Sequence, residues 1–391
     1  MDKKPKRMVP EVRFKGFTDD WEQRKFKNSV SRITKHDNNS DLPHIEYENI
    51  NSGMGSLKNR ISELHTEKDG VVFQKNDILF GKLRPYLKNW YFANFDGIAV
   101  GDFWILRSDN IYPKFVYYLI QTEKFFSISN LSSGSKMPRS DWNLVSNYKF
   151  QFPQKIQESM NIGQLLSVLD KLLSLQQRKL EQLKQLKKAM LQRLLVSKKG
   201  KLISNIRFKD FTETWEQRKF GDIANRESKQ IESTSDIPSV EYDDIVSNQG
   251  NLNKDISTKK AKKKGIEFND TNVLYGKLRP YLHNWLNASF TGVAVGDWWV
   301  LKPVKIRKNF LYYLIQTKKY DNVANLSSGS KMPRSDWNLV SNTAFSIPNT
   351  EEEQEKIGIF LSDLESLITL HQRKLNQLSK IKKFCLQKMF I

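Results

Sequence analysis

Apolar residues follow a heptad pattern through residues 156–196 and predict one long helix there. They recur with a seven-residue period in two interleaved series, Ile162, Leu169, Leu183 and Met190 in the first and Leu166, Leu173, Leu180 and Leu194 in the second. The segment contains no proline, and its only glycine, Gly163, lies near its start. This spacing is typical of a coiled-coil helix, whose apolar seam needs a partner helix to cover it.

A second helix with the same pattern is expected in residues 349–391. Its seam comprises Ile357, Leu361, Leu364, Ile368, His371, Leu375, Leu378, Lys382, Cys385 and Met389. Polar residues interrupt both seams, at Gln176 and Lys187 in the first helix and at His371 and Lys382 in the second. A buried polar group opposite leucine would cost roughly 1–3 kcal/mol. Matching the interruptions therefore predicts an antiparallel pair with Gln176 opposite Lys382 and Lys187 opposite His371.

The helical pattern returns because the chain consists of two copies of one unit. The recurring segments are WEQRKF at 21–26 and 215–220, GKLRPYL at 81–87 and 276–282, QRKL at 177–180 and 372–375, and the unchanged block 130–147, which returns as 325–342. A fixed long period of this kind indicates duplication of a whole domain rather than a solenoid of short repeats.

The globular part of each copy is predicted to mix short strands with helices. In the first copy, strands are expected at 44–50, 71–73, 77–80, 98–106 and 148–152, helices at 113–122 and 139–145, and a polar loop or hairpin at 27–42. The predicted fold class is α+β, with two similar globular domains alternating with two long helices that pair as an antiparallel coiled coil. The predicted boundaries are 1–155, 156–196, 197–348 and 349–391, with Pro153 and Pro348 just before the two helices.

The charge of the chain points to a polyanionic partner. Its 391 residues carry 64 Lys and Arg against 43 Asp and Glu, a net charge of +21. Nucleic acid is the usual partner of such an excess, and a merely solvated basic surface is the alternative. No apolar run approaches the ~18 residues of a membrane span, and one cysteine, Cys385, cannot form an internal disulfide. We therefore expect a cytoplasmic protein with no membrane contact.

Two repeated basic segments are candidates for contact with DNA. In GKLRPYL, a pair of cations lies beside a turn and an aromatic residue, Lys82 and Arg84 in the first copy and Lys277 and Arg279 in the second. Such a set suits phosphate contact and stacking, whereas the alternative is a solvated turn whose tyrosine packs in the core.

The second candidate lies in the block that is identical in both copies. Its small hydroxyl residues around a glycine would leave backbone N–H groups open to phosphate, and two cations add charge. The candidate residues are Ser133, Ser135, Lys136 and Arg139, and in the second copy Ser328, Ser330, Lys331 and Arg334. The alternative is a surface loop followed by a helix capped by Ser140 or Asp141, with Trp142 in the core.

The sequence gives little support to catalysis. None of the five histidines recurs at the matching position of the other copy, and no phosphate-binding glycine loop followed by Lys and Ser or Thr is present. Asp102 and Asp297 are the best repeated acids, and a turn or capping role is the simpler interpretation of both. We therefore predict no catalytic residue and no metal site in this chain.

The layout resembles the specificity subunit of a type I restriction–modification system over essentially the whole chain. Two α+β units each lead into a heptad helix after a proline, with WEQRKF near the start of each. The resemblance implies that each globular domain is a target recognition domain that reads half of a bipartite site in double-stranded DNA. It also implies that the helices form a spacer that docks methylation subunits, expected to be two, and that restriction subunits join them. S-adenosylmethionine, ATP and Mg would then be bound by the partner subunits, with no cofactor on this chain.

Two other functions remain open at this point. The first is a self-sufficient DNA methylase or nuclease fragment. The second is a coiled-coil scaffold with no role in DNA binding. The first would need a methyl-donor or metal-carboxylate site, and the second leaves the net charge of +21 unexplained.

Overall fold

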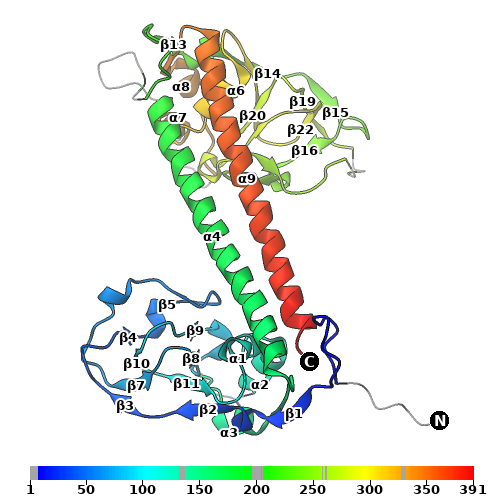
Figure 1. Cartoon of the computed structure of the whole chain (residues 1–391). Coiled ribbons are helices and arrows are strands. Elements are labelled where there is room, and N and C mark those ends of the chain that lie inside the picture. The colour runs from blue at the N-terminus through cyan, green and yellow to red at the C-terminus, as the bar shows by residue number, and fades with distance from the viewer. Residues whose placement is uncertain are drawn as a thin grey trace, which may run out of the picture. The chain divides into compact units, whose positions relative to one another are not determined.

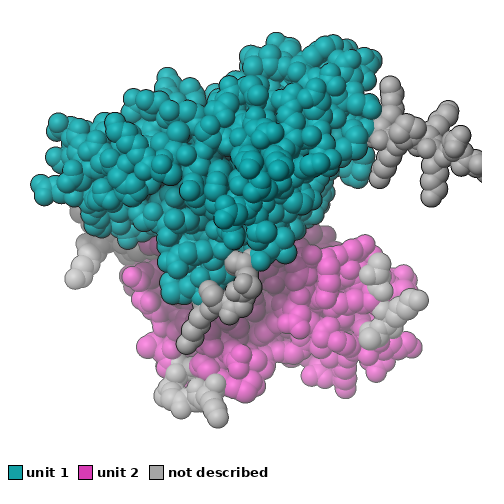
Figure 2. Space-filling view, turned by 90° about the horizontal axis from the view of Figure 1, so that it is seen from below, with its two compact units in different colours: residues 1–177, 373–391 teal, residues 178–372 magenta. Residues whose placement is uncertain are grey.

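The computed structural model describes residues 8–131, 137–195, 204, 206–257, 259, 262–326 and 332–391. The chain divides into two compact units, which Figure 2 shows in different colours. Unit 1 comprises residues 1–177 and 373–391, and unit 2 comprises residues 178–372. Each unit thus takes one part of each long helix.

Unit 1 contains the globular part of the first copy, drawn in blue and cyan in Figure 1, together with the first part of the helix that follows it and the last residues of the chain. Its strands are β1 Glu22–Lys25, β2 Val30–Ile33, β3 His36–Asp37, β4 His44–Ile45, β5 Ile50–Asn51, β6 Ser56–Leu57, β7 Gly70–Phe73, β8 Ile78–Gly81, β9 Trp90–Phe92, β10 Gly97–Ala99, β11 Phe103–Ser108 and β12 Lys149–Phe152. Its helices are α1 Pro113–Leu119, α2 Glu123–Ser129, α3 Trp142–Asn147 and the first part of α4 Ile156–Leu194, with short 3₁₀ turns η1 Phe26–Asn28, η2 Tyr47–Asn49, η3 Ile61–Glu63 and η4 Pro85–Leu87.

Two four-stranded sheets form the body of unit 1. Their strand orders are β2-β11-β8-β9, which is antiparallel throughout, and β3-β7-β10-β4, in which only β10 and β4 run parallel. Side chains alternate along β11, where Phe103 and Ile105 join the core shared by the two sheets and Trp104 and Leu106 join the core beneath the helices. The sheet β2-β11-β8-β9 is therefore the middle layer of the unit.

The structure corrects three of the predicted elements. The run 98–106 is two strands in different sheets, because the chain turns at Gly101, whose φ is +98°. The predicted strand at 44–50 is interrupted by η2, and the polar segment 27–42 contains β2 and β3 rather than only a loop or hairpin. The other predicted strands are present, and the helix predicted at 113–122 ends at Leu119.

Unit 2 repeats this arrangement strand by strand. Its strands are β13 Glu216–Lys219, β14 Ala224–Glu227, β15 Gln230–Glu232, β16 Ser239–Val240, β17 Ile245–Val246, β18 Asn251–Leu252, β19 Lys264–Phe268, β20 Val273–Gly276, β21 Trp285–Asn287, β22 Gly292–Ala294, β23 Trp298–Pro303 and β24 Ala344–Ile347. Its helices are α5 Phe220–Ile223, α6 Lys308–Leu314, α7 Lys318–Ala324, α8 Trp337–Asn342 and the first part of α9 Glu351–Lys388, with η5 Tyr242–Asp244 and η6 Pro280–Leu282. Its large sheets have the orders β14-β23-β20-β21 and β15-β19-β22-β16, which match those of unit 1.

Within each unit, the two parts of α4 and α9 run in opposite directions. In unit 1, Arg13 pairs with Glu158 near the start of α4 while the neighbouring Val12 N–H donates to Lys388 O near the end of α9. Further along, Asp170 of α4 pairs with Lys382 of α9 at 2.6 Å. Positions that ascend along α4 thus meet positions that descend along α9, which confirms an antiparallel pair (Figure 1).

The predicted facing of the polar seam residues is corrected by the ion pairs. Lys382 pairs with Asp170, six residues before the predicted Gln176, and in unit 2 Lys187 pairs with Glu365 at 2.6 Å, six residues before the predicted His371. The prediction matched the polar seam residues of one helix with those of the other and left out the carboxylates beside the seam. A carboxylate neutralises a half-buried lysine better than an amide or an imidazole does. Both ion pairs indicate a shift of about one heptad from the predicted register.

A tyrosine of the short helices supports each of these ion pairs. Tyr118 OH donates to Asp170 at 2.8 Å, and Lys382 Nζ lies 5.6 Å from the centre of the Tyr118 ring. Tyr313 repeats both contacts in unit 2, with Glu365 at 2.9 Å and Lys187 at 5.7 Å. The helix pair is therefore joined to the globular part of each unit by the same three-residue contact.

In the described part of the chain, no helix is long and apolar enough to cross a membrane.

Cross-linking tests the register. The native Cys385 and Leu166 belong to one buried cluster in unit 1, whereas the register predicted from the seam interruptions places Leu173 opposite Cys385. We expect Leu166→Cys to cross-link to Cys385 with a short bis-maleimide, as read by the altered gel mobility of the product. Efficient cross-linking through Leu173→Cys instead, with none through Leu166→Cys, would restore the predicted register.

A buried ion pair fixes the start of each long helix and yields a stability prediction. Glu353 accepts two hydrogen bonds from Arg207 at 2.7 Å and one from Trp215 Nε1 at 3.2 Å, and its side chain is 1% exposed. Glu353→Ala would leave Arg207 buried without its carboxylate, and we expect it to destabilise unit 2 by about 3 kcal/mol. Denaturant unfolding followed by hydrogen exchange of unit 2 amides measures the loss.

The matched control for Glu353 is an exposed ion pair in the same unit. Lys356 and Asp210 lie 2.9 Å apart with both side chains about half or more exposed, so Asp210→Ala should cost less than about 1 kcal/mol. Equal losses of unfolding free energy from Glu353→Ala and Asp210→Ala would contradict the claim that burial makes the Arg207–Glu353 pair important for stability.

Candidate nucleic-acid interface

Asp102 gathers two of the predicted DNA-contacting cations in unit 1. Its Oδ2 accepts hydrogen bonds from Nε and Nη2 of Arg139 at 3.3 and 3.1 Å, and Lys82 Nζ lies 3.5 Å from Oδ1. Lys82 follows β8, Asp102 precedes β11 and Arg139 precedes α3, so three separate segments meet here. Two cations share one carboxylate, which leaves a net positive charge, and the Arg139 side chain stays 56% exposed. The cluster can therefore still bind an anion.

Backbone hydrogen bonds hold this cluster in place. Asp102 O accepts from Tyr47 OH at 2.5 Å and from Lys82 N–H at 2.9 Å, and Tyr47 OH in turn accepts from Leu83 N–H at 3.1 Å. Leu83 also forms an isolated antiparallel bridge with Arg139. Burial raises the pKa of Tyr47 well above its usual range, so its hydroxyl remains a neutral donor and acceptor. A turn role for Asp102 is thus correct for its carbonyl, while its carboxylate separately binds the cations.

The same cluster recurs in unit 2 with nearly identical geometry. Its members are Tyr242, Lys277, Leu278, Asp297 and Arg334. Arg334 approaches Asp297 to 3.3 and 3.1 Å, Lys277 lies 3.6 Å away, and Tyr242 OH donates to Asp297 O at 2.5 Å. Hydrogen bonds to Asp297 raise the pKa of Arg334 above its ordinary value. Four of the predicted contact residues are therefore brought together in pairs, one pair in each unit.

Arg84 and Arg279 extend this surface from the adjoining turn. Both side chains are exposed, and both residues adopt the left-handed conformation with φ of +49°. The Arg84 N–H donates to Pro138 O at 2.7 Å, and the Arg279 N–H donates to Pro333 O at the same distance. These bonds tie the GKLRPYL turn to the segment that carries the second predicted arginine.

Six predicted contact residues lie outside the residues that the structure describes. They are Ser133, Ser135, Lys136, Ser328, Ser330 and Lys331. Their proposed contacts with phosphate therefore stay predictions. The described residue that follows each of these blocks is a methionine, and Arg139 and Arg334 come two residues later.

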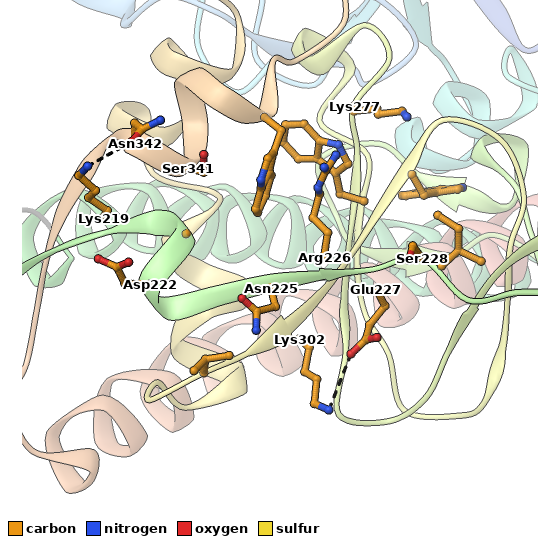
Figure 3. Close-up of a pocket in the computed structure, with 16 residues that line it drawn as sticks. Lys219, Asp222, Asn225, Arg226, Glu227, Ser228, Lys277, Lys302, Ser341 and Asn342 are labelled. Atoms are coloured by element: carbon orange, nitrogen blue, oxygen red, sulfur yellow. Dashed lines mark hydrogen bonds and ion pairs between the residues drawn. The ribbon is translucent and has the colours of Figure 1, made fainter.

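An open cleft in unit 2 adjoins the cluster. It has a volume of about 980 Å³, and Lys277 lines it together with Lys219, Arg226 and Lys302. The guanidinium of Arg226 stacks over the ring of Trp337 at 4.6 Å from its centre. Figure 3 shows the other two lysines bonded at the rim, Lys219 to Asn342 and Lys302 to Glu227. A concave, cationic surface with an aromatic wall suits contact with a nucleic-acid strand.

Sequence reasoning missed the arginine that stacks on this tryptophan. The equivalent pair in unit 1 is Arg32 over Trp142, at 5.0 Å. Arg32 and Arg226 occupy matching places in β2 and β14, within segments that otherwise share little between the copies. The sequence did contain a signal for this contact, because the same arginine is retained in both copies inside a block that otherwise differs. Trp142, predicted to be a core residue, is half-buried with Arg32 over its ring.

Beside the turns, the two units differ in a pair of packed residues. In unit 1, Lys88 Nζ lies 5.3 Å from the centre of the Phe126 ring. In unit 2 the matching residues are His283 and Asp321, with His283 Nε2 at 2.9 Å from Asp321 Oδ1. The shared cation clusters are therefore set in different surroundings.

Among the described residues, no group of three or more His, Cys, Asp or Glu side chains is placed to hold a metal ion. The absence of a metal from this chain stays a prediction.

Comparisons with known proteins agree on one family. The sequence profile of the type I restriction modification DNA specificity domain matches residues 18–185 and again residues 212–380. The specificity subunit of the type I restriction enzyme MjaVIII from Methanocaldococcus jannaschii is 22% identical over 393 aligned positions, which cover 87% of this chain and 83% of that protein.

Solved structures show the same fold. The S subunit of a type I restriction–modification system from M. genitalium superposes with a TM-score of 0.67 at 14% identity, covering 98% of this chain and 99% of that one. A chain from a study of complex assembly and conformational transition of the type I R-M system gives a TM-score of 0.50 at 14% identity, covering 94% and 97% of the two chains.

Proposed function

This chain belongs to the type I restriction–modification DNA specificity family, and from that premise we propose that it reads a bipartite site in double-stranded DNA, one half-site with each unit. The observation that carries the proposal is the cluster of Lys82, Asp102 and Arg139, which recurs in unit 2 with distances that agree within 0.1 Å. Charged side chains held this way suit phosphate contacts that orient a protein on DNA. Arg32 and Arg226, on the tryptophan faces, add a second contact in each unit.

We further propose that the chain itself performs no catalysis. It would dock methylation subunits, expected to be two, together with restriction subunits, and these partners would bind S-adenosylmethionine, ATP and Mg. The relative whose name mentions a specificity subunit and the structure from a study of complex assembly support this division of labour. Methyl transfer to DNA by the purified chain alone would instead favour a self-sufficient methylase.

The salt dependence of DNA binding tests the electrostatic part of the proposal. Binding of duplex DNA by the full chain should weaken steeply with salt, because neutralised phosphates release counterions. Arg139→Ala should lower the slope of log K against log salt by about 1 and weaken binding similarly for all sequences. Gel shifts at several salt concentrations measure both quantities.

Lys155 provides the control for a general loss of charge. It is an exposed cation that pairs with Asp19 at 2.9 Å just before α4, away from the Asp102 cluster in sequence. Lys155→Ala should leave the salt slope unchanged. A slope reduced equally by both substitutions would mean that the DNA contact is not localised at Arg139.

We also propose that the helix pair sets the gap between the two half-sites. Seven residues inserted into each helix, after Gln177 and after Gln372, keep the apolar seam in phase and add about 10 Å of helix. At about 3.4 Å per base pair, the recognised gap should lengthen by roughly three base pairs with the half-site bases unchanged. Methylome sequencing of cells that carry the variant with its methylation subunits reads the gap directly, and an unchanged gap would reject the role as a spacer.

A further inference from the structure

A small apolar tip projects from the turn that follows the cation Lys82. It is the 3₁₀ turn η4, Pro85–Leu87, between β8 and β9. Tyr86 is 50% exposed and Leu87 is 41% exposed, while Pro85 is buried beneath them. The alternative interpretation of this segment, in which the tyrosine packs in the core, is therefore wrong, and the side chain is open to a partner.

The tip is held rigidly in a conformation that its residues adopt at a cost. Arg84 and Lys88, which bracket it, both have positive φ, +49° and +56°, although neither is glycine. Backbone bonds enforce this shape, since Leu87 N–H donates to Arg84 O at 2.8 Å and Lys88 N–H donates to Pro85 O at 2.9 Å. Strained backbone that the surrounding structure maintains is commonly found where a protein meets its ligand.

The same tip is present in unit 2, although its support differs. Tyr281 and Leu282 are 52% and 38% exposed on η6, and the bracketing residues Arg279 and His283 again have positive φ. Lys88 packs on a phenylalanine ring, whereas His283 bonds to an aspartate. The two units thus support the same exposed Tyr-Leu pair with different contacts. This indicates that the exposed pair, rather than the contacts beneath it, is the functional feature.

The surroundings of the tip indicate what covers it. Its immediate neighbour Arg84 is an exposed cation. Lys82 and Arg139 lie on the two segments that the Leu83–Arg139 bridge joins beside the tip. A partner that buries tyrosine and leucine here must also carry negative charge at close range. Duplex DNA offers both, with stacked apolar base faces flanked by phosphates.

We propose that Tyr86–Leu87 and Tyr281–Leu282 are wedges that enter the DNA at each half-site and open one base step. This inference rests on the proposed function in DNA recognition and assigns it a mode, because an inserted wedge unstacks bases and bends the duplex. Sequence preference would then arise partly from how readily a step opens, in addition to contacts with base edges.

Fluorescence of 2-aminopurine tests the wedges, because this adenine analogue brightens when it loses its stacking neighbours. Duplexes that the full chain selects from a randomised pool would be labelled at each adenine in turn. The wild-type chain should raise the signal several-fold at one step in each half-site. Tyr86→Ala with Leu87→Ala should abolish the rise in one half-site only, and Tyr281→Ala with Leu282→Ala in the other.

Each double variant serves as the matched control of the other, and Tyr86→Phe should keep the rise because it retains the stacking face. Since both side chains are exposed, the variants should keep the circular dichroism of the wild type. Bound duplexes without any rise, or with a rise that the double variants leave intact, would overturn the wedge and leave the proposed function standing. Loss of methylation-subunit binding with an unchanged DNA signal would assign the tip to a protein partner. Failure to select any duplex would overturn the proposed function and the wedge together.

Discussion

The hydrophobic core of each unit is covered in part by residues at the end of the other copy's long helix, which pack onto it. In unit 1 the chain terminus does this, since the Phe390 ring lies 4.9 Å from that of Phe115, with Met389 buried in the same core. In unit 2 the end of α4 does it, with Leu194 and Leu195 buried among the residues that pack around Trp215. Each globular copy therefore packs against residues that belong to the other copy of the repeat, and the helices are part of both hydrophobic cores.

This sharing makes the register of the helices a requirement of the fold. A slip along the seam would separate Lys382 from Asp170 in unit 1 and Lys187 from Glu365 in unit 2 at the same time, leaving half-buried charges unpaired. Apolar seam residues are nearly interchangeable from one heptad to the next, so they fix the direction of the pair poorly and its offset hardly at all. The lysine–carboxylate pairs fix the offset instead. Tyr118 and Tyr313 bond to the carboxylates of these pairs and so join the helices to the globular parts.

Much of this architecture is predictable from the sequence, because heptads, proline positions and exact repeats are local signals. The two long helices and their antiparallel direction are confirmed, but the predicted offset is wrong, because Asp170 and Glu365 lie beside the seam rather than in it. The run 98–106 resembles one strand because both of its parts are apolar, which is how a strand buried on both faces appears. The turn at Gly101 and the assignment of β10 and β11 to different sheets separate them, and the sheet assignment depends on tertiary structure.

The candidate interface is predictable in composition and not in organisation. Lys82 and Arg139 are recognisable as repeated cations, but their shared partner Asp102 lies in a third segment, and a carboxylate after a glycine resembles a turn residue. For the tyrosine in GKLRPYL, the sequence leaves stacking on a partner and packing in the core as alternatives. Alternation along a strand predicts burial, whereas residues in a turn bracketed by left-handed positions follow no such period, so only the structure shows that this side chain is exposed.

Duplication also shows which parts of the unit are free to change. At the position of the buried Leu64 in unit 1, unit 2 carries Lys259, whose ammonium bonds to Asp244 and Glu241. The apolar packing that Leu64 provides in unit 1 is supplied in unit 2 by Ile256, which is buried one turn earlier in the sequence. Asp244 is buried too, and desolvation alone would raise its pKa. Hydrogen bonds from Lys259, Lys254 and the Glu241 N–H together outweigh that effect and keep the pKa of Asp244 below its ordinary value.

The fold thus accepts either a lysine with its carboxylate partners or a buried apolar side chain at the same place. The cation cluster nevertheless keeps its geometry in both units. Side chains around the cluster can change because hydrogen bonds from the hydroxyls of Tyr47 and Tyr242 to the backbone carbonyls of Asp102 and Asp297, rather than those neighbours, hold the cluster in place. A surface built this way can alter the surroundings of a fixed cation cluster without rebuilding the cluster itself, which is the property that the proposed pair of DNA-reading units needs.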